Sequence, residues 1–75
     1  MYYKKLRALR DENNLSQAEL ADILHIDQRI YSNYELGKKE IPANLLIRLS
    51  RYYNVSTDYL LDLTDMSIMY PRKHL

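Results

Sequence analysis

The chain has 75 residues with a net charge of +1, and 47% of its residues are hydrophobic. This composition favours one small packed domain over disorder, and the absence of cysteine excludes a disulfide framework and a thiolate metal site. The sequence contains no signal peptide and no apolar run long enough to cross a bilayer, so we expect a cytoplasmic protein without a membrane partner.

A first helix is expected over about residues 2–13, followed by Asn14, because asparagine tolerates the left-handed conformation at a helix end. Three basic side chains of this helix, Lys4, Lys5 and Arg7, give the N-terminus a positive surface. Two interpretations stay open for them: a solvated helix face, or contacts with phosphate groups. Because the net charge is only +1, any affinity for nucleic acid must come from a local basic surface.

Two short helices joined by a tight corner are predicted at residues 17–24 and 28–36. Ser16 and Glu19 form the S-x-x-E pattern of a capping box, in which a hydroxyl and a carboxylate each satisfy a backbone group at a helix start. Asp27 is placed to cap the second helix in a similar way. The three residues between the two helices therefore form the corner.

The second of these helices has a polar and an apolar side when its residues are placed at about 100° per residue. The polar side carries Gln28, Arg29, Ser32 and Asn33 together with Leu36, and the opposite side carries Ile30, Tyr31, Tyr34 and Glu35. The four polar residue types present donors and acceptors to the edges of DNA bases, whereas a solvated helix face is more commonly lysine and glutamate. The pattern alone leaves two interpretations open: a base-reading helix and an ordinary exposed helix.

Gly37 is the only glycine of the chain, and it follows this helix at the place where a left-handed residue ends a helix. Lys38 and Lys39 come next, and their positive charges interact favourably with the negative end of the helix dipole. Because they stand beside the polar helix, we expect them to reach phosphate groups. The alternative is that the two lysines contribute only to the solubility of the protein.

Pro42 is expected in the first turn of a fourth helix over residues 42–53. A fifth helix is predicted over residues 57–63, after Ser56 as its cap. Residues 66–75 begin apolar and end polar, without a clear period. This tail could pack back on the domain, form a subunit contact or be loose, and an oligomer or partner contact is slightly favoured because so many apolar side chains are seldom left in water.

The sequence shows no catalytic or metal-binding constellation. The only two histidines, His25 and His74, have no cysteine with which to complete a metal site. The carboxylates are scattered through caps and exposed faces, and no nucleophile–base pair or phosphate loop is apparent. We therefore expect no metal ion, no cofactor and no enzymatic activity.

The run from Leu15 to Gly37 resembles the helix-turn-helix of the phage-repressor and Cro-like (XRE) regulators. The matching residues are Leu15, Ser16, Gln17, Leu20, Ala21, Leu24, Ile26, Tyr31, Ser32, Tyr34, Glu35, Gly37, Lys38 and Pro42. The resemblance extends over roughly residues 6–61. It implies an all-α, compact, five-helix, lambda-repressor-like DNA-binding domain, here expected over residues 1–65.

The resemblance also implies roles for individual side chains. It places Gln28, Arg29 and Asn33 at base edges, and Ser32 at bases or the DNA backbone. Phosphate groups are expected at Gln17, Lys38, Lys39 and Asn44. A structural ion pair is expected between Arg10 and Glu35.

Two residues depart from the family pattern. His25 stands where glycine is common, a tolerable change because histidine is enriched at positive φ. Ile30 stands where a small or polar residue is common. We expect Ile30 to pack on the core, with contact to a thymine methyl group as the alternative.

These observations predict a sequence-specific regulator of transcription that binds double-stranded DNA. The resemblance implies a repressor that acts as a homodimer on an inverted-repeat operator. An alternative is an antitoxin or adaptor module whose main partner is another protein, bound through residues 66–75. The two functions differ in whether specific DNA or a protein partner is bound most tightly.

Overall fold

The computed structural model describes residues 3–66, which form five helices and no strand. The helices are α1 (Lys4–Glu12), α2 (Gln17–Leu24), α3 (Gln28–Glu35), α4 (Ala43–Tyr53) and α5 (Thr57–Leu60). The prediction of an all-α, five-helix fold is therefore confirmed. None of these helices is long and apolar enough to span a membrane.

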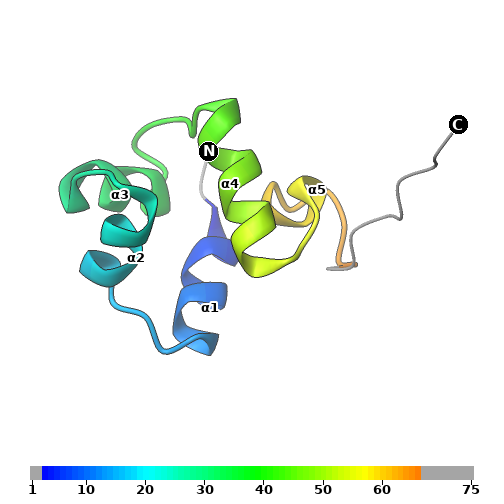
Figure 1. The fold of residues 1–75 in the computed structure, drawn as a ribbon. Helices are drawn as coiled ribbons and strands as arrows, with labels where there is room; N and C mark the ends of the chain where they lie inside the picture. Colours follow the sequence, from blue (N-terminus) through cyan, green and yellow to red (C-terminus); the bar gives the residue numbers. More distant parts are fainter. Residues whose placement is uncertain (1–2, 67–75) are drawn as a thin grey trace, which may run out of the picture.

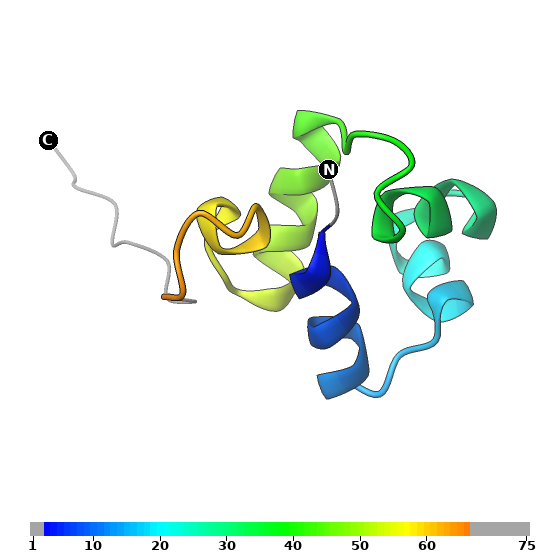
Figure 2. The same ribbon diagram turned by 180° about the vertical axis from the view of Figure 1, so that it is seen from behind.

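The helices surround one hydrophobic core. Helices α2 and α3 lie at one end of the molecule and α5 at the other, with α1 and α4 between them (Figure 1), and the view from behind shows the same order (Figure 2). Leu6 of α1, Leu20 of α2, Tyr31 of α3, Leu49 of α4 and Leu60 of α5 are each at most 1% exposed. Every helix thus contributes an almost fully buried side chain, and burial of this kind is the main favourable term in folding.

Local signals in the chain set the corner between α2 and α3. The Ser16 hydroxyl oxygen accepts from the Glu19 N–H at 3.0 Å, and the Glu19 carboxylate accepts from the Ser16 N–H at 3.0 Å. At the other end of α2, His25 has φ 58° and ψ 42°, the left-handed conformation. The Asp27 carboxylate then accepts from the Arg29 N–H at 2.7 Å and starts α3. The predicted capping residues and the predicted left-handed corner are both confirmed.

Some predicted helix bounds were wrong. Helix α1 begins at Lys4, while residue 2 lies outside the described residues. Helix α3 ends at Glu35, and Pro42 is the extended residue before α4, with ψ 146°, instead of part of its first turn. Helix α5 ends at Leu60, three residues early, because the chain turns into a left-handed residue at Asp62 with φ 61°. The predicted tail contact falls on residues 66–75, of which 67–75 also lie outside the described residues.

Two of the basic side chains at the N-terminus contact the segment after α5. Lys4 Nζ lies 3.3 Å from Asp62 Oδ2, and Lys5 Nζ lies 3.6 Å from Asp62 Oδ1. Lys5 also lies 4.3 Å from the centre of the Tyr59 ring, within range of a cation–π contact. These contacts give Lys4 and Lys5 a structural role in holding α1 against the last part of the fold.

Candidate nucleic-acid interface

Helix α3 buries one side and exposes the other. Tyr31 is fully buried and Glu35 is 4% exposed, so this edge of the helix faces the core. On the opposite edge Gln28 and Arg29 are exposed, and Ser32 is half-buried. The buried edge fixes the rotation of α3 about its axis, and that rotation turns the polar side chains outward.

Ile30 does not pack in the core as expected. Its side chain is 45% exposed. Each residue of a helix is turned by about 100° from the one before it, so Ile30 lies well away from the narrow edge that Tyr31 and Glu35 bury. The expectation was wrong because the core-facing side of α3 is narrower than the apolar pattern suggested. Contact with a thymine methyl group stays a prediction for Ile30.

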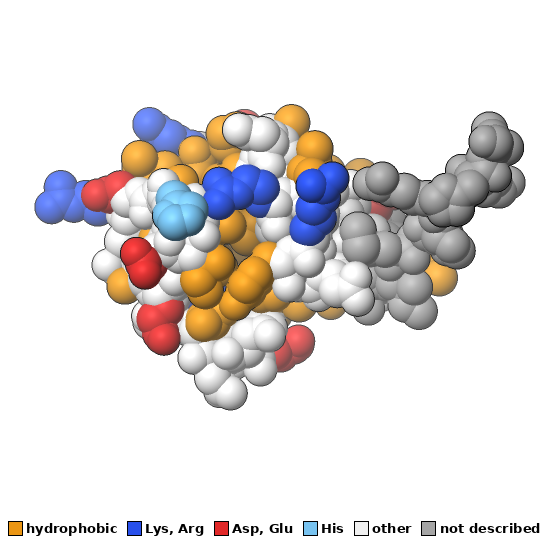
Figure 3. Space-filling model, viewed as in Figure 1, with side chains coloured by type: hydrophobic (Ala, Val, Ile, Leu, Met, Phe, Trp, Pro, Cys, Tyr) orange, Lys and Arg blue, Asp and Glu red, His pale blue; other side chains and the backbone are white. Residues whose placement is uncertain are grey.

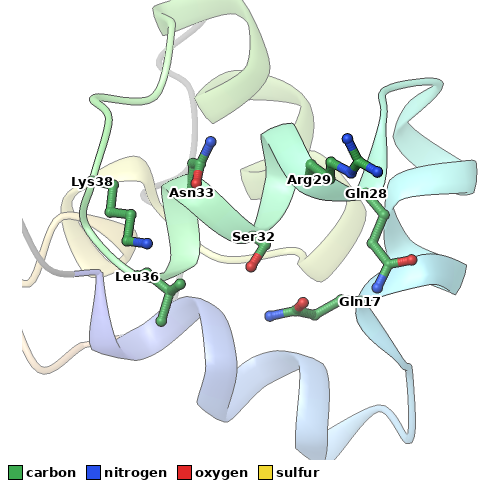
Figure 4. Close-up of a pocket in the computed structure, with 7 residues that line it drawn as sticks. All are labelled: Gln17, Gln28, Arg29, Ser32, Asn33, Leu36 and Lys38. Atoms are coloured by element: carbon green, nitrogen blue, oxygen red, sulfur yellow. The ribbon is translucent and has the colours of Figure 1, made fainter.

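The outward side of α3 forms the wall of a polar hollow of about 400 Å³. The hollow is lined by Gln17, Gln28, Arg29, Ser32, Asn33, Leu36 and Lys38 (Figure 4). All four predicted base-reading residues and two of the predicted phosphate-binding residues therefore lie together. Figure 4 shows Ser32 pointing toward Gln17, while Arg29 and Asn33 point away from Gln17. The arrangement presents a mixed row of donors and acceptors to solvent.

Gln17 joins this hollow to the interior of the fold. It is the first residue of α2, and its side-chain amide donates from Nε2 to Glu35 Oε1 at 3.3 Å. One amide hydrogen is thus used inside the protein, and the second hydrogen and the oxygen remain available to a ligand. The contact orients the side-chain amide of Gln17. Sequence reasoning missed it because Gln17 and Glu35 are 18 residues apart.

Glu35 is held by Arg10 of α1 through two hydrogen bonds. Arg10 Nε donates to Glu35 Oε2 at 3.0 Å, and Arg10 Nη2 donates to Glu35 Oε1 at 2.9 Å. Burial alone would raise the pKa of Glu35, but the hydrogen bonds and charge of Arg10 hold that pKa below its ordinary value of 4.5. The carboxylate therefore stays ionised and fixes the end of α3 against α1.

The loop between α3 and α4 carries the two lysines that were predicted to contact phosphate groups. Lys38 and Lys39 are exposed, and only Lys38 lines the polar hollow. The Tyr3 hydroxyl donates to Glu40 Oε2 at 2.6 Å and accepts from the Ile41 N–H at 3.4 Å. This anchor holds the loop to the N-terminal residues, and nothing in the sequence pattern indicated it.

Asn44 lies apart from the polar hollow. It is exposed near the start of α4, and its side-chain oxygen accepts from the Leu45 N–H at 2.9 Å. Leu36, by contrast, lines the hollow although no role was predicted for it. Its place on the polar side of the helical projection was the available signal. Leu36 is 55% exposed and is an apolar side chain among the polar residues that line the hollow.

A family model described as a helix-turn-helix domain matches residues 3–66 of this chain. This chain belongs to the helix-turn-helix domain family. The resemblance to XRE-type regulators predicted from the sequence is therefore confirmed. In this helix-turn-helix domain, α2 and α3 are the two helices of the motif, and the polar hollow lies on the outward side of α3.

Several proteins named as HTH-type transcriptional regulators are similar to the helix-turn-helix domain. The uncharacterized HTH-type transcriptional regulator YobD of Bacillus subtilis is 42% identical over 65 residues, which are 87% of this chain and 58% of YobD. The regulator ImmR of Bacillus subtilis is 39% identical over 64 residues, 85% of this chain and 50% of ImmR. The putative regulatory protein PH1808 of Pyrococcus horikoshii is 37% identical over 51 residues, 68% of this chain and 16% of PH1808.

The chain spans about half the length of the two Bacillus subtilis relatives. The similarity therefore covers the helix-turn-helix domain, which is only part of each of those proteins. No solved structure matches the chain.

Proposed function

We propose that this helix-turn-helix domain is a sequence-specific regulator of transcription that binds double-stranded DNA. The observation that carries the proposal is the outward side of α3, where four side chains able to bind base edges line one hollow. The relatives named as transcriptional regulators support the same conclusion. In this proposal α3 enters the major groove, and Gln28, Arg29 and Asn33 contact base edges, with Ser32 at bases or the backbone.

Phosphate contacts hold the domain on the duplex in this proposal. In support of a phosphate contact by Gln17, it is the first residue of α2, and backbone N–H groups and the positive dipole end at a helix start attract anions. Lys38 lies at the other end of the same hollow, and Lys39 follows it on the exposed loop. Asn44 is a weaker candidate because its side-chain oxygen already accepts a backbone hydrogen bond.

The regulator is proposed to act in the cytoplasm as a repressor, as a dimer on an inverted-repeat operator. The net charge of +1 supports the dimer, because few phosphate contacts per copy give weak binding by one copy alone. Two copies would read half-sites about one helical turn apart, roughly 34 Å. Occupancy of the operator would exclude RNA polymerase.

The proposal is tested by binding the purified chain to its own upstream DNA and to a scrambled duplex of equal length, over a series of salt concentrations. We expect tight, salt-sensitive binding to the native sequence and at least 1000-fold weaker binding to the scrambled duplex, as is usual for specific regulators. Equally weak binding to both duplexes would contradict the proposal.

A protein partner is the second candidate function, that of an antitoxin or adaptor. Exposed apolar side chains at the end of the described residues favour it: Leu63 is 70% exposed and Met66 is 55% exposed. In this case a co-encoded protein would co-purify with the chain, and removal of residues 66–75 would release it without changing DNA binding.

A further inference from the structure

Helices α2 and α4 enclose a second hollow, apolar in character, away from the polar one. Its volume is about 340 Å³, and it is lined by Ile23, Leu24, Arg48, Arg51 and Tyr52. No residue lines both hollows. Figure 3 shows apolar side chains gathered over α2 and α4, with basic side chains along one margin. This face is therefore available for a role separate from the candidate nucleic-acid interface.

The apolar side chains of this face are only partly covered by the chain itself. Ile23 of α2 is 38% exposed and Tyr52 of α4 is 46% exposed. Single exposed apolar residues are ordinary on a protein surface, but these two converge on one hollow. Burial of their exposed area would remove apolar surface from water, which favours association.

The two helices beside the hollow carry opposite charge. Arg48 and Arg51 line the hollow from α4 and are exposed. Asp22 does not line it, but it is exposed on α2 and directly precedes Ile23, which does. Within residues 3–66 none of these three side chains takes part in an ion pair. The face is thus apolar in the middle, basic on one side and acidic on the other.

Such a face is complementary to itself under a two-fold rotation. In an isologous interface the same patch is used by both copies, so the acidic margin of each copy can meet the basic margin of the other. We propose that a second copy of this chain docks on the α2–α4 face, with Asp22 of each copy opposite Arg48 and Arg51 of the other. Ile23 and Tyr52 of the two copies then cover one another.

This inference rests on the dimer of the proposed function and names the face through which it forms. Five residues line the hollow, whereas a standard interface involves about 20–30 residues on each side, so the dimer is expected to be weak and reversible. Electrostatic complementarity at its margins fixes orientation and excludes other pairings more than it adds affinity.

The test is sedimentation equilibrium of the full chain without DNA, at concentrations up to about 1 mM, where even weak complexes form. We expect a reversible dimer for the natural chain. Arg48→Glu and Arg51→Glu, examined one at a time, should weaken it at least tenfold. Arg7→Glu, which reverses an exposed arginine of α1 away from this face, should leave it unchanged. A natural chain that stays monomeric, or equal dimerisation in all four proteins, would overturn the proposal.

Mixing variants gives a second and sharper readout. Asp22→Lys should also lose the dimer, because it places a cation opposite the two arginines. Mixed with the double variant Arg48→Glu/Arg51→Glu, it should form a heterodimer, since the introduced lysine then faces two glutamates and the natural Asp22 faces two arginines. Circular dichroism of each variant verifies the helical fold first. Two folded variants that stay monomeric in the mixture would overturn the proposed pairing of margins.

Binding to a duplex with a single half-site separates this inference from the proposed function. The arginine variants should bind the half-site as the natural chain does while losing the dimer. Loss of half-site affinity with an unchanged dimer would assign the arginines to DNA phosphates and overturn the interface. Failure of the natural chain to prefer any DNA sequence would overturn the proposed function, and the mass measurements would still decide the interface.

Discussion

Arg10 on α1 and Glu35 at the end of α3 form a two-bond ion pair that links three segments of the chain. The guanidinium donates to the two carboxylate oxygens at 3.0 Å and 2.9 Å. Its remaining terminal nitrogen, Nη1, donates to the carbonyl oxygen of Leu15 at 2.8 Å, just before α2. Because Glu35 also accepts from Gln17, one pair sets how α2 and α3 lie on α1.

Removal of Arg10 is therefore expected to harm the fold rather than base reading alone. Arg10→Ala leaves the Glu35 carboxylate buried without its main partner, which typically destabilises a protein by about 3–5 kcal/mol. Urea unfolding followed by circular dichroism measures the change. Arg7→Ala, at an exposed site on the same helix, is the control and should change stability by less than about 0.5 kcal/mol. Equal midpoints for the two variants would show that the pair is not structural.

The same pair predicts a loss of stability in acid. The pKa of Glu35 is lower in the folded chain than its ordinary value of 4.5, so below that value the unfolded chain binds more protons. The stabilisation is present above about pH 4.5 and is lost as the pH falls through the folded-state pKa. Glu35→Gln should be less stable at neutral pH and should lose less stability on acidification.

Glu19→Gln provides the comparison for this pH series. The pKa of Glu19 is also lowered, by the backbone N–H and hydroxyl of Ser16, but Glu19 is exposed and glutamine can replace it in a capping box. The stability of the Glu19→Gln variant should therefore decline in acid almost as steeply as that of the natural chain. If Glu35→Gln declines just as steeply as the natural chain, the ionised Glu35 is not a source of the acid sensitivity.

His25 is predicted to be a suboptimal residue at the corner of the motif. Its left-handed conformation, φ 58° and ψ 42°, disfavours a side chain with a Cβ atom by about 1–2 kcal/mol relative to glycine. His25→Gly should therefore raise the thermal midpoint, and His25→Val should lower it because a β-branched residue fits this conformation poorly. The opposite order of midpoints would mean that the imidazole makes a stabilising contact that outweighs the backbone strain.

Lys38 is predicted to contribute to DNA affinity without contributing to sequence preference. Lys38→Ala should weaken binding to all duplexes by a similar factor and reduce the salt slope by about one unit, as expected for the loss of one phosphate contact. Lys4→Ala is the matched control, because Lys4 lies beside Asp62 and not in the polar hollow. An unchanged slope for Lys38→Ala would remove this lysine from the phosphate contacts.

The motif was predictable from sequence because its signals are local. Ser16, Glu19 and Asp27 act within three residues of the helix starts that they cap, and these determined the bounds of α2 and the start of α3. The helical period likewise predicted which side chains of α3 share the polar hollow.

Long-range contacts were not predictable in the same way. The bond from Gln17 to Glu35 and the anchor of Tyr3 on Glu40 join residues 18 and 37 positions apart. No period in the sequence encodes such pairs. The exposure of Ile30 was missed for a related reason, since the width of the buried edge of α3 depends on which helices pack against it and not on α3 alone.

Binding of the natural chain and of Arg29→Ala to duplexes that carry every single base-pair change of the bound site tests the central claim most directly. The claim is that the outward side of α3 reads base edges. We expect the natural chain to lose about 1–3 kcal/mol of binding free energy when the guanine that Arg29 contacts is replaced. Arg29→Ala should bind equally well whichever base pair stands at that position, and should keep its preference at every other position. Gln28→Ala serves as the matched control and should lose preference at a different base pair. Uniform weakening at every position by both variants would contradict base reading by α3.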